Sequence, residues 1–318
     1  MATATVLIPT LNARELLRDA LASLAGETVV VVDNASTDGT AEMVARDFPG
    51  VRLLRNEENL GFGRAVNRGA AEAEGDVLVL LNNDVVCEPG FVAEICAPFA
   101  DDRVGMAAGV LVQAASPELI DSAGIEIDPT LRAFDYLWNR PLPELEHAPD
   151  PLGPCGGAAA YRLAAFREAG GFDEAFFAYW EDTELALRLR LAGWDCRLAP
   201  GARALHRHGT TLGASSPAAR RLEAFGRAYV LAKHRVPRGP RVALLDWPAL
   251  LVHAVFRREL APISERRRGL REGRRNALAG PAPTGLATVP YRESLARQWR
   301  AFRLRTRGEL PEHFYDER

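Results

Sequence analysis

The feature that most constrains the fold is a series of short apolar runs alternating with segments of helical periodicity. The predicted strands are residues 5–9, 28–33, 51–55 and 76–81, and the predicted helices between them are 13–25, 39–47 and 63–73. Residues 29–32 and 77–81 are apolar at every position, which is typical of strands buried on both faces. The pattern therefore predicts an α/β fold with a mostly parallel sheet and right-handed βαβ crossovers.

Composition and charge exclude several classes of protein. With 47% hydrophobic and 25% charged residues, the chain of 318 residues is expected to be globular. A net charge of −3 gives no reason to expect a nucleic-acid partner. The four cysteines show no C-x-x-C spacing, so we expect reduced thiols and no zinc site or disulfide framework.

No segment has the pattern of a signal peptide or a membrane-spanning helix. The longest apolar stretch, residues 242–256, is interrupted by Asp246, Pro248 and His253 and is too short to span a bilayer. We therefore expect a cytoplasmic protein.

The later part of the chain changes character twice. Residues 116–154 are proline-rich without clean periodicity, and we interpret them as a variable insert or mobile loops. Regular patterning resumes at 156–163 and in a predicted helix over 183–192, and a helix-like segment covers 216–235. We place a boundary near residue 214, giving one domain over 1–213 and a mostly helical extension over 214–318.

Polar residues follow the predicted strands at the edge where α/β proteins bind ligands. Asp33 ends the second strand, where its carboxylate could accept a hydrogen bond from a nucleobase or a ribose. It could equally cap the next helix, and the two interpretations have about equal weight. Ser36 or Asp38 could also cap that helix, and Gly39 suits the turn.

Asn82-Asn83-Asp84 follows the fourth strand. A carboxylate here could bind a divalent cation that bridges two phosphates, although a simple turn explains the triplet as well. His206, beyond a predicted strand over 202–205, could complete the metal shell, with His208 as an alternative. Isolated histidines are more often structural, so this assignment depends on the surrounding motifs.

Glu181 and Asp182 open a predicted helix after an aromatic stretch. Acidic residues suit a helix N-terminus because of the macrodipole. The functional alternative is that one carboxylate accepts a proton from a substrate hydroxyl as a general base.

Together these segments resemble the inverting family 2 glycosyltransferases with the GT-A fold, especially their rhamnosyltransferase-like branch. The resemblance covers about residues 4–213, and the pieces occur in the family's order. The matching segments are residues 6–12 (VLIPTLN), 32–40 (VDNASTDGT), 59–63 (NLGFG) with Asn67 and Gly69, 81–84 (LNND), 170–177 (GGFDEAFF), 181–182 (ED), 193–194 (GW) and His206.

The resemblance implies a role for each matching residue. Asp33 corresponds to the base-binding aspartate, Asp84 to the last residue of the D-x-D metal motif for Mg²⁺ or Mn²⁺, and His206 to the downstream metal ligand. Asp182, with Glu181 beside it, corresponds to the catalytic base of the E-D motif. The implied donor contacts are Pro9, Thr10, Asn12, Asp33, Ser36, Gly61, Gly63, Asn67, Asn83 and Asp84.

One departure from the family pattern bears on the metal. Asn82 replaces the first carboxylate of D-x-D, so Asp84 is the single acid of the triplet. Our hypothesis is that the cation binds weakly until the donor diphosphate is present.

The resemblance predicts direct, inverting transfer of a sugar from dTDP-rhamnose or a UDP-sugar to a glycan or lipid-linked acceptor in cell-surface polysaccharide assembly. One alternative, a sugar-phosphate nucleotidyltransferase, would need a Gly-rich phosphate loop after the first strand, and residues 9–14 are not one. The other, a non-catalytic sugar-nucleotide-binding protein, is disfavoured because the four expected functional residues are all retained.

Gly61-Phe62-Gly63 also invites a dinucleotide-binding interpretation. That fingerprint requires a third glycine at position 66, which is Val66, and it should follow a strand rather than Asn59. We therefore reject it and expect Gly61 and Gly63 to let the backbone approach the donor.

Arginines dominate residues 257–307. A solvated helical face is the simplest explanation. A sharper hypothesis is peripheral attachment to an anionic membrane on its inner face, supported by Trp247, Leu250, Leu251 and Phe256 nearby. A homodimer interface is the third alternative.

Overall fold

The structure is a computed structural model that describes residues 2–207, 216–236, 261–279, 283, 285–286 and 288–307. The chain divides into two compact units. The first comprises Met1–Glu126, Phe134–Phe177 and Asp182–Thr211, and the second Ile127–Ala133, Ala178–Glu181 and Leu212–Arg318. The boundary predicted near residue 214 falls in 208–215, outside the described residues, and stays a prediction.

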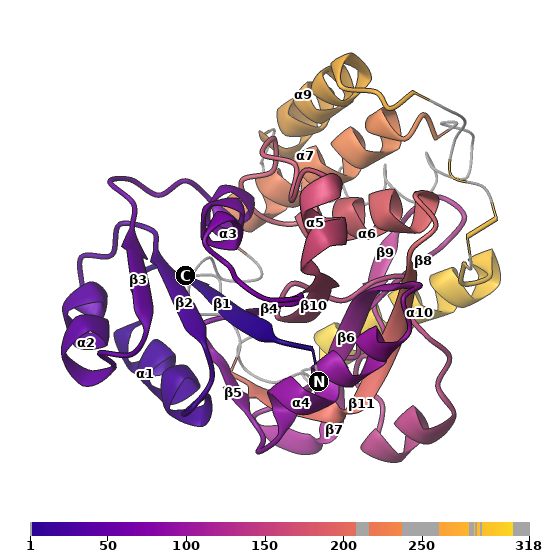
Figure 1. The fold of residues 1–318 in the computed structure, drawn as a ribbon. Helices are drawn as coiled ribbons and strands as arrows, with labels where there is room; N and C mark the ends of the chain where they lie inside the picture. Colours follow the sequence, from indigo (N-terminus) through magenta and orange to yellow (C-terminus); the bar gives the residue numbers. More distant parts are fainter. Residues whose placement is uncertain are drawn as a thin grey trace. The chain divides into compact units, whose positions relative to one another are not determined.

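Figure 1 shows the elements along the chain. The strands are β1 (Ala4–Thr10), β2 (Val29–Asp33), β3 (Arg52–Arg55), β4 (Val77–Leu81), β5 (Val85–Cys87), β6 (Val104–Gln113), β7 (Ser116–Ser122), β8 (Ile125–Ile127), β9 (Ala133–Asp135), β10 (Ala158–Arg162) and β11 (Asp195–His206). The helices are α1 (Arg14–Ser23), α2 (Thr40–Asp47), α3 (Phe62–Ala71), α4 (Phe91–Cys96), α5 (Leu163–Glu168), α6 (Glu181–Leu191), α7 (Pro217–Lys233), α9 (Ala261–Arg275) and α10 (Tyr291–Arg307), with 3₁₀ turns at Ala97–Ala100 and Leu142–His147.

The first half of the sheet is the predicted βαβ series. Strands β3, β2, β1 and β4 lie in that order and are mutually parallel. Every residue of β2 and β4 is buried, as their uninterrupted apolar runs predict. The α/β prediction is confirmed, and each of the four expected strands is present within a residue or so of its expected bounds.

The second half of the sheet joins the first through β10. This strand runs antiparallel to both β4 and β6, and β6 then pairs in parallel with β11. Because β10 is reversed, β6 and β11 again run in the direction of β1–β4. Their carboxyl ends therefore lie at the same edge of the sheet as those of β1, β2 and β4.

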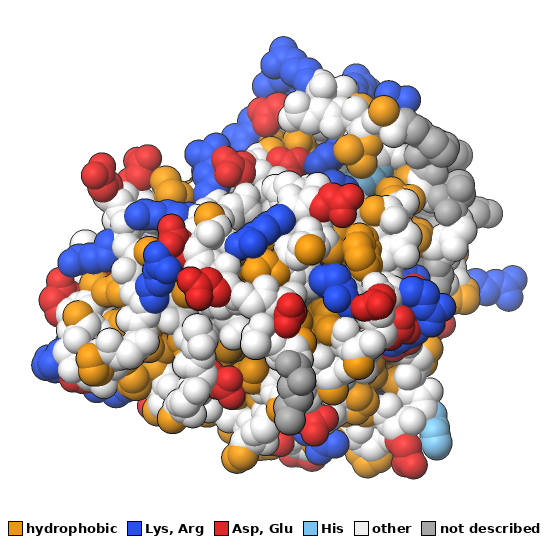
Figure 2. Space-filling view, in the orientation of Figure 1, with side chains coloured by type: hydrophobic (Ala, Val, Ile, Leu, Met, Phe, Trp, Pro, Cys, Tyr) orange, Lys and Arg blue, Asp and Glu red, His pale blue; other side chains and the backbone are white. Residues whose placement is uncertain are grey.

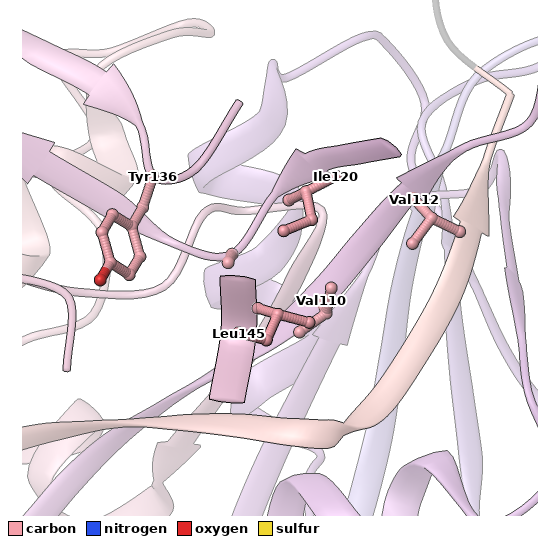
Figure 3. Packing of buried hydrophobic residues seen from close by; sticks show 6 residues of the cluster. Val110, Val112, Ile120, Tyr136 and Leu145 are labelled. Carbon is pink, nitrogen blue, oxygen red and sulfur yellow. The ribbon is translucent and has the colours of Figure 1, made fainter. Parts of the chain in front are cut away.

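Of the two interpretations of residues 116–154, mobile loops is wrong, and a variable insert stays a prediction. This region contains β7, β8, β9 and a 3₁₀ turn, and β7 pairs antiparallel with β6. Figure 3 shows the apolar cluster that fixes it. The cluster consists of Val110, Val112, Ile120, Ala123, Tyr136 and Leu145. Short strands and a register shift hide the period-2 pattern, which explains why no strand was predicted here.

The second unit contains a close helix pair. In α7, Ser216 caps the N-terminus by accepting a hydrogen bond from the Ala219 N–H at 3.0 Å. Gly269 and Gly273 of α9 face the α7 backbone, and a methyl group on either would overlap a carbonyl oxygen of α7. Small residues four apart therefore let the two helices approach closely.

Two clusters of arginines, at residues 266–268 and 274–275, lie on α9. Figure 2 shows blue Lys and Arg side chains gathered at its upper end, where Figure 1 places this helix. Among the described residues, no helix is both long enough and apolar enough to cross a bilayer. The apolar residues 247, 250, 251 and 256, named above as membrane contacts, lie outside the described part of the chain.

All four cysteines are free and buried. Burial raises the pKa of Cys87 and Cys155 to about 12 and that of Cys96 to about 11. This agrees with the expectation of reduced, unreactive thiols.

Gly61 offers a test of the close packing in the first unit. It has φ +82°, and a methyl group there would overlap the carbonyl oxygen of Phe177. We expect Gly61→Ala to lower the free energy of unfolding by about 2–4 kcal/mol, from left-handed strain plus overpacking. Urea denaturation would measure it. The matched control is Gly26→Ala, which has φ +92° and open space around it, so its loss should be about 1–2 kcal/mol. Equal losses in the two variants would contradict this explanation.

Candidate active site

The ends of β1, β2 and β4 bring several of the predicted donor-binding residues together. Thr10 and Asp33 are register partners in β1 and β2. Asn83, just beyond β4, donates its side-chain N–H to the Thr10 hydroxyl at 2.9 Å. Pro9 lies beside Val32 in the same pair of strands. The three loops after these strands therefore meet at one edge of the sheet.

Asp33 is fully buried at the end of β2. Its Oδ1 accepts a hydrogen bond from the Ser36 N–H at 3.1 Å. Its Oδ2 is buried and has no hydrogen-bond partner among the described residues, and the nearest cation is Arg55 Nε at 3.7 Å. A buried carboxylate oxygen without a hydrogen bond is uncommon and calls for an explanation. A ligand N–H would supply the missing donor.

Asn12 and Ser36 join the loops after β1 and β2. The Asn12 N–H donates to Ser36 Oγ at 2.9 Å, and Asn12 Oδ1 accepts from the Thr37 N–H at 2.8 Å. Of the two residues considered as caps for α2, Asp38 contacts its start by accepting from the Thr40 N–H at 3.0 Å. The Ser36 side chain instead contacts Asn12 in the loop after β1.

Gly61, Gly63 and Asn67 lie in or beside α3. The Phe62 N–H donates to the Phe177 carbonyl at 2.7 Å, and Gly61 is pressed against the same residue. The Asn67 amide both donates to and accepts from the backbone of Phe172, at 2.9 and 2.8 Å. These residues hold the segment that leads to α6. Their donor contacts stay predictions.

Asp84 and His206 are brought together by the pairing of β5 with β11, in which Val85 is the partner of His206. The distance from His206 Nε2 to Asp84 Oδ1 is 3.3 Å, and both side chains are about one-tenth exposed. His206 is the last residue of β11 rather than a residue beyond it. Burial alone would lower the pKa of His206, but hydrogen bonds to Asp121 and Asp84 raise it to about 10.

The two side chains fit a divalent cation that has further ligands. One carboxylate oxygen and one imidazole nitrogen suit Mg²⁺ or Mn²⁺. Across the described residues, no group of three His, Cys, Asp or Glu side chains could enclose a metal. Such a site would need phosphate oxygens and water to complete it. The presence of Asn82 in place of the first aspartate of the D-x-D motif also suggests this. His208, the alternative ligand, lies outside the described residues.

Asp182 is held at the start of α6, close to the end of β4. Its Oδ2 accepts from the Gly156 N–H at 3.1 Å and its Oδ1 from the Thr183 N–H at 2.6 Å. The carbonyl of Gly157, the residue after Gly156, accepts a hydrogen bond from the Asn82 N–H at 3.3 Å. Burial raises the pKa of Asp182, although these hydrogen bonds oppose the shift. Glu181, the first residue of α6, is buried, whereas Asp182 is partly buried.

The structure adds two aspartates that the sequence analysis missed. Asp121 of β7 is 4% exposed, and its Oδ2 lies 2.7 Å from His206 Nδ1. Asp135 of β9 is accessible to solvent, yet it interacts electrostatically with Asp121, Asp182 and His206. Both belong to the region interpreted as loops. The sequence shows that acidic residues are present in this region. Because no strands were predicted there, the sequence analysis could not place these residues at this edge of the sheet.

Solved structures with low sequence identity show the fold. The mannosyltransferase PcManGT from Pyrobaculum calidifontis, in complex with GDP-Man and Mn²⁺, superposes with a TM-score of 0.53 at 19% identity, covering 94% of this chain and 80% of that one. GalNAc-T7 with UDP, GalNAc and Mn²⁺ gives a TM-score of 0.58 at 18% identity, covering 78% and 54%. The fold is therefore that of the GT-A glycosyltransferases, as expected.

The sequence comparisons then define the family. The profile of glycosyl transferase family 2 matches residues 5–170. The N-acetylglucosaminyl-diphospho-decaprenol L-rhamnosyltransferase of Mycobacterium tuberculosis is 32% identical over 276 residues, which cover 78% of this chain and 89% of the relative. The pre-mycofactocin glycosyltransferase of the same organism is 31% identical over 212 residues, covering 65% and 43%. The chain belongs to glycosyl transferase family 2 and is a glycosyltransferase.

Asp135 leads to a prediction on pH. Desolvation by the surrounding protein, together with the charges of Asp121 and Asp182, raises the pKa of Asp135 to about 7 from 3.8. A carboxyl group whose pKa is raised in the folded state contributes stability that is complete below pH 3.8 and lost as the pH rises to about 7. We therefore expect Asp135→Asn to flatten the fall in unfolding free energy across this window.

Urea denaturation of the metal-free protein at a series of pH values would check this. Asp102→Asn, at an exposed aspartate on the turn before β6, is the control and should keep the wild-type slope. An unchanged slope for Asp135→Asn would show that this carboxyl group does not titrate as described.

Proposed function

We propose that this enzyme is an inverting rhamnosyltransferase that uses dTDP-rhamnose and a divalent cation to glycosylate a polyprenyl-diphosphate-linked sugar. The donor and acceptor classes are suggested by the relative that covers most of the chain, whose name gives L-rhamnose transfer to a decaprenyl-diphospho-sugar. A UDP-sugar is the alternative donor. The setting would be assembly of a cell-surface polysaccharide on the cytoplasmic side of the membrane.

The observation that carries the proposal is the position of Asp182. Its carboxylate accepts a hydrogen bond from the Gly156 N–H, and Gly156 lies beside the end of β4. Asp84, which contacts His206, follows the same end of β4. The same edge therefore presents a partly buried carboxylate and, close to it, a candidate site for a cation and a diphosphate. Direct displacement at an anomeric carbon needs both.

In the proposed reaction, Asp182 acts as the general base. It accepts the proton of the acceptor hydroxyl as that oxygen forms a bond to the anomeric carbon. The bond from this carbon to the diphosphate oxygen breaks, and the nucleoside diphosphate leaves with the electron pair. Burial makes Asp182 a better base than an exposed aspartate. A cation on Asp84 and His206 would supply charge neutralisation of the leaving group.

The nucleoside would bind near Asp33. The Asp33 Oδ2 could accept the N–H of a thymine or uracil ring if Arg55, now 3.7 Å away and half-exposed, swung aside. A hollow of about 560 Å³ begins beside this point and has room for a nucleoside. It is lined by Asn56, Glu57, Glu58, Leu60 and Arg68.

A polyprenyl-linked acceptor would require the enzyme to work at a membrane surface. On α10, Leu295 and Trp299 are 40% and 62% exposed and lie one turn apart. Arg292 and Arg300 are exposed on the same helix. An apolar pair beside arginines is the pattern of a helix that lies on an anionic bilayer. We propose this contact in preference to a homodimer interface.

Donor turnover tests the proposed chemistry. Purified protein with Mg²⁺ or Mn²⁺, a lipid-linked N-acetylglucosaminyl diphosphate acceptor and a panel of nucleotide sugars should release dTDP from dTDP-rhamnose, and chelation should abolish this release. We expect Asp182→Asn to lower kcat by about 10²–10⁴-fold, with dTDP affinity little changed.

Glu181→Gln is the comparison, since it alters the neighbouring carboxylate at the same helix start and should have a smaller effect. If turnover survives Asp182→Asn, then this residue only caps α6 and is not the base. If the wild type binds dTDP-rhamnose but transfers nothing to any acceptor, the non-catalytic alternative is favoured.

Sedimentation with vesicles tests the membrane contact. At low salt, the protein should sediment with phosphatidylglycerol vesicles and not with phosphatidylcholine vesicles. The double variant Leu295→Ser/Trp299→Ser should bind about 100-fold more weakly or worse, because the membrane-bound state loses about 1.5–3 kcal/mol of apolar burial for each of the two side chains. Leu191→Ser, at a 44%-exposed leucine of α6, is the control and should bind as the wild type does. Unchanged binding of the double variant would rule out α10 as the contact.

A further inference from the structure

Asp121 is a buried carboxylate for which the proposed reaction has no direct use. It is 4% exposed, and its Oδ2 lies 2.7 Å from His206 Nδ1. The opposite ring nitrogen of His206 faces Asp84 at 3.3 Å. The imidazole is therefore held between two carboxylates, one on each nitrogen. Asp84 belongs to the proposed metal site, and Asp121 lies on the side of the ring away from it.

The backbone of β7 directs the Asp121 side chain toward His206. In the pairing with β6, Leu111 is opposite Ser122 but Val112 is opposite Ile120, so β7 has one more residue than β6 at this point. The extra residue is Asp121. A β-bulge of this kind redirects a side chain that regular alternation would place elsewhere, and bulges are frequent next to active sites.

The residues around Asp121 are fixed on all sides. Ile120 is fully buried in the cluster of Figure 3, with Val110 and Val112 of β6. On the other edge of β7, the Ile120 N–H donates to the Arg140 carbonyl at 2.8 Å and the Ala123 N–H to the Tyr136 carbonyl at 2.9 Å. Both flanking residues are thus anchored, and the carboxylate between them has little freedom to turn away from His206.

We propose that Asp121 is a positioning residue that prepares His206 to bind the divalent cation. Asp121 accepts the Nδ1–H of the ring, so that a cation bound beside Asp84 would meet the lone pair of Nε2. A neutral histidine otherwise has two tautomers, and the one with a proton on Nε2 cannot bind a metal through that nitrogen. The hydrogen bond also fixes the plane of the ring and increases its basicity. The inference rests on the proposed metal role of Asp84 and His206.

The test is Mn²⁺ affinity, measured by the electron paramagnetic resonance signal of free Mn²⁺ with and without saturating dTDP. We expect Asp121→Ala and Asp121→Asn to raise the Kd of Mn²⁺ about 10- to 100-fold. Glu118→Gln removes the same charge from an exposed position on the same strand and should leave the Kd unchanged. A Kd for both Asp121 variants within twofold of the wild type would overturn the inference.

His206→Ala separates this inference from the proposed function. If it abolishes Mn²⁺ binding while the Asp121 variants retain it, then the metal site stands and the role of Asp121 does not. If the wild type binds no Mn²⁺ with dTDP present, both fail.

A second measurement covers the case in which Asp121→Ala does not fold. In ¹⁵N-histidine spectra of the Mg²⁺- and dTDP-loaded enzyme, with His206→Gln used for assignment, the wild type should show His206 protonated on Nδ1 alone. The isosteric Asp121→Asn should show a mixture of tautomers or protonation on Nε2. A wild-type spectrum in Asp121→Asn would contradict the inference, since a purely structural role for Asp121 would leave the tautomer unchanged.

Discussion

The site depends on the antiparallel pairing of β10 between β4 and β6. Without this strand, the βαβ half of the sheet and the β6–β11 half would have no shared edge. Ala158, Ala159 and Ala160 are fully buried, and their small side chains let β10 fit between two strands that are themselves buried. Because β10 runs in reverse, its first residue, Ala158, lies beside Leu81 at the end of β4. The Gly156 N–H that holds Asp182 is placed by this reversal alone.

A second constraint is electrostatic. Aspartates 84, 121 and 135 interact with a single imidazole, that of His206, in one region of the first unit, and Asp182 interacts with Asp135. Negative charges placed close together are unfavourable, and the raised pKa values of Asp135, Asp182 and His206 express that cost as retained protons. An environment of this sign favours a bound cation. The bulge at Asp121 and the strand end at His206 therefore serve the same electrostatic purpose although they are far apart in sequence.

The parallel half of the fold was predictable because its signals are local. The runs at β2 and β4 are apolar throughout, and Asp33 and Asp84 follow directly from where those strands end. The region around Asp121 and Asp135 was not predictable in the same way. Strands β8 and β9 have three residues each, which is too few for an alternation to be recognised, and the bulge in β7 breaks the period. The contact of Asp121 with His206 spans 85 positions and exists only through β6, which separates the two strands. Gly61 and Asn67 were predicted to contact the donor, but in the structure they pack against the backbone of Phe177 and Phe172. A sequence motif alone does not distinguish backbone packing from ligand contact.

The four buried thiols can report local unfolding of this enzyme. None is bonded to another, and all have pKa values shifted upward by burial, so a thiolate forms readily only when the surrounding structure unfolds. Cys87 lies in β5, which pairs with β11, and Cys96 lies in α4, whereas Cys155 lies just before β10 and Cys196 lies in β11. Alkylation at each site therefore samples a local opening, and site-resolved rates would show which part of the first unit opens first without any engineered label.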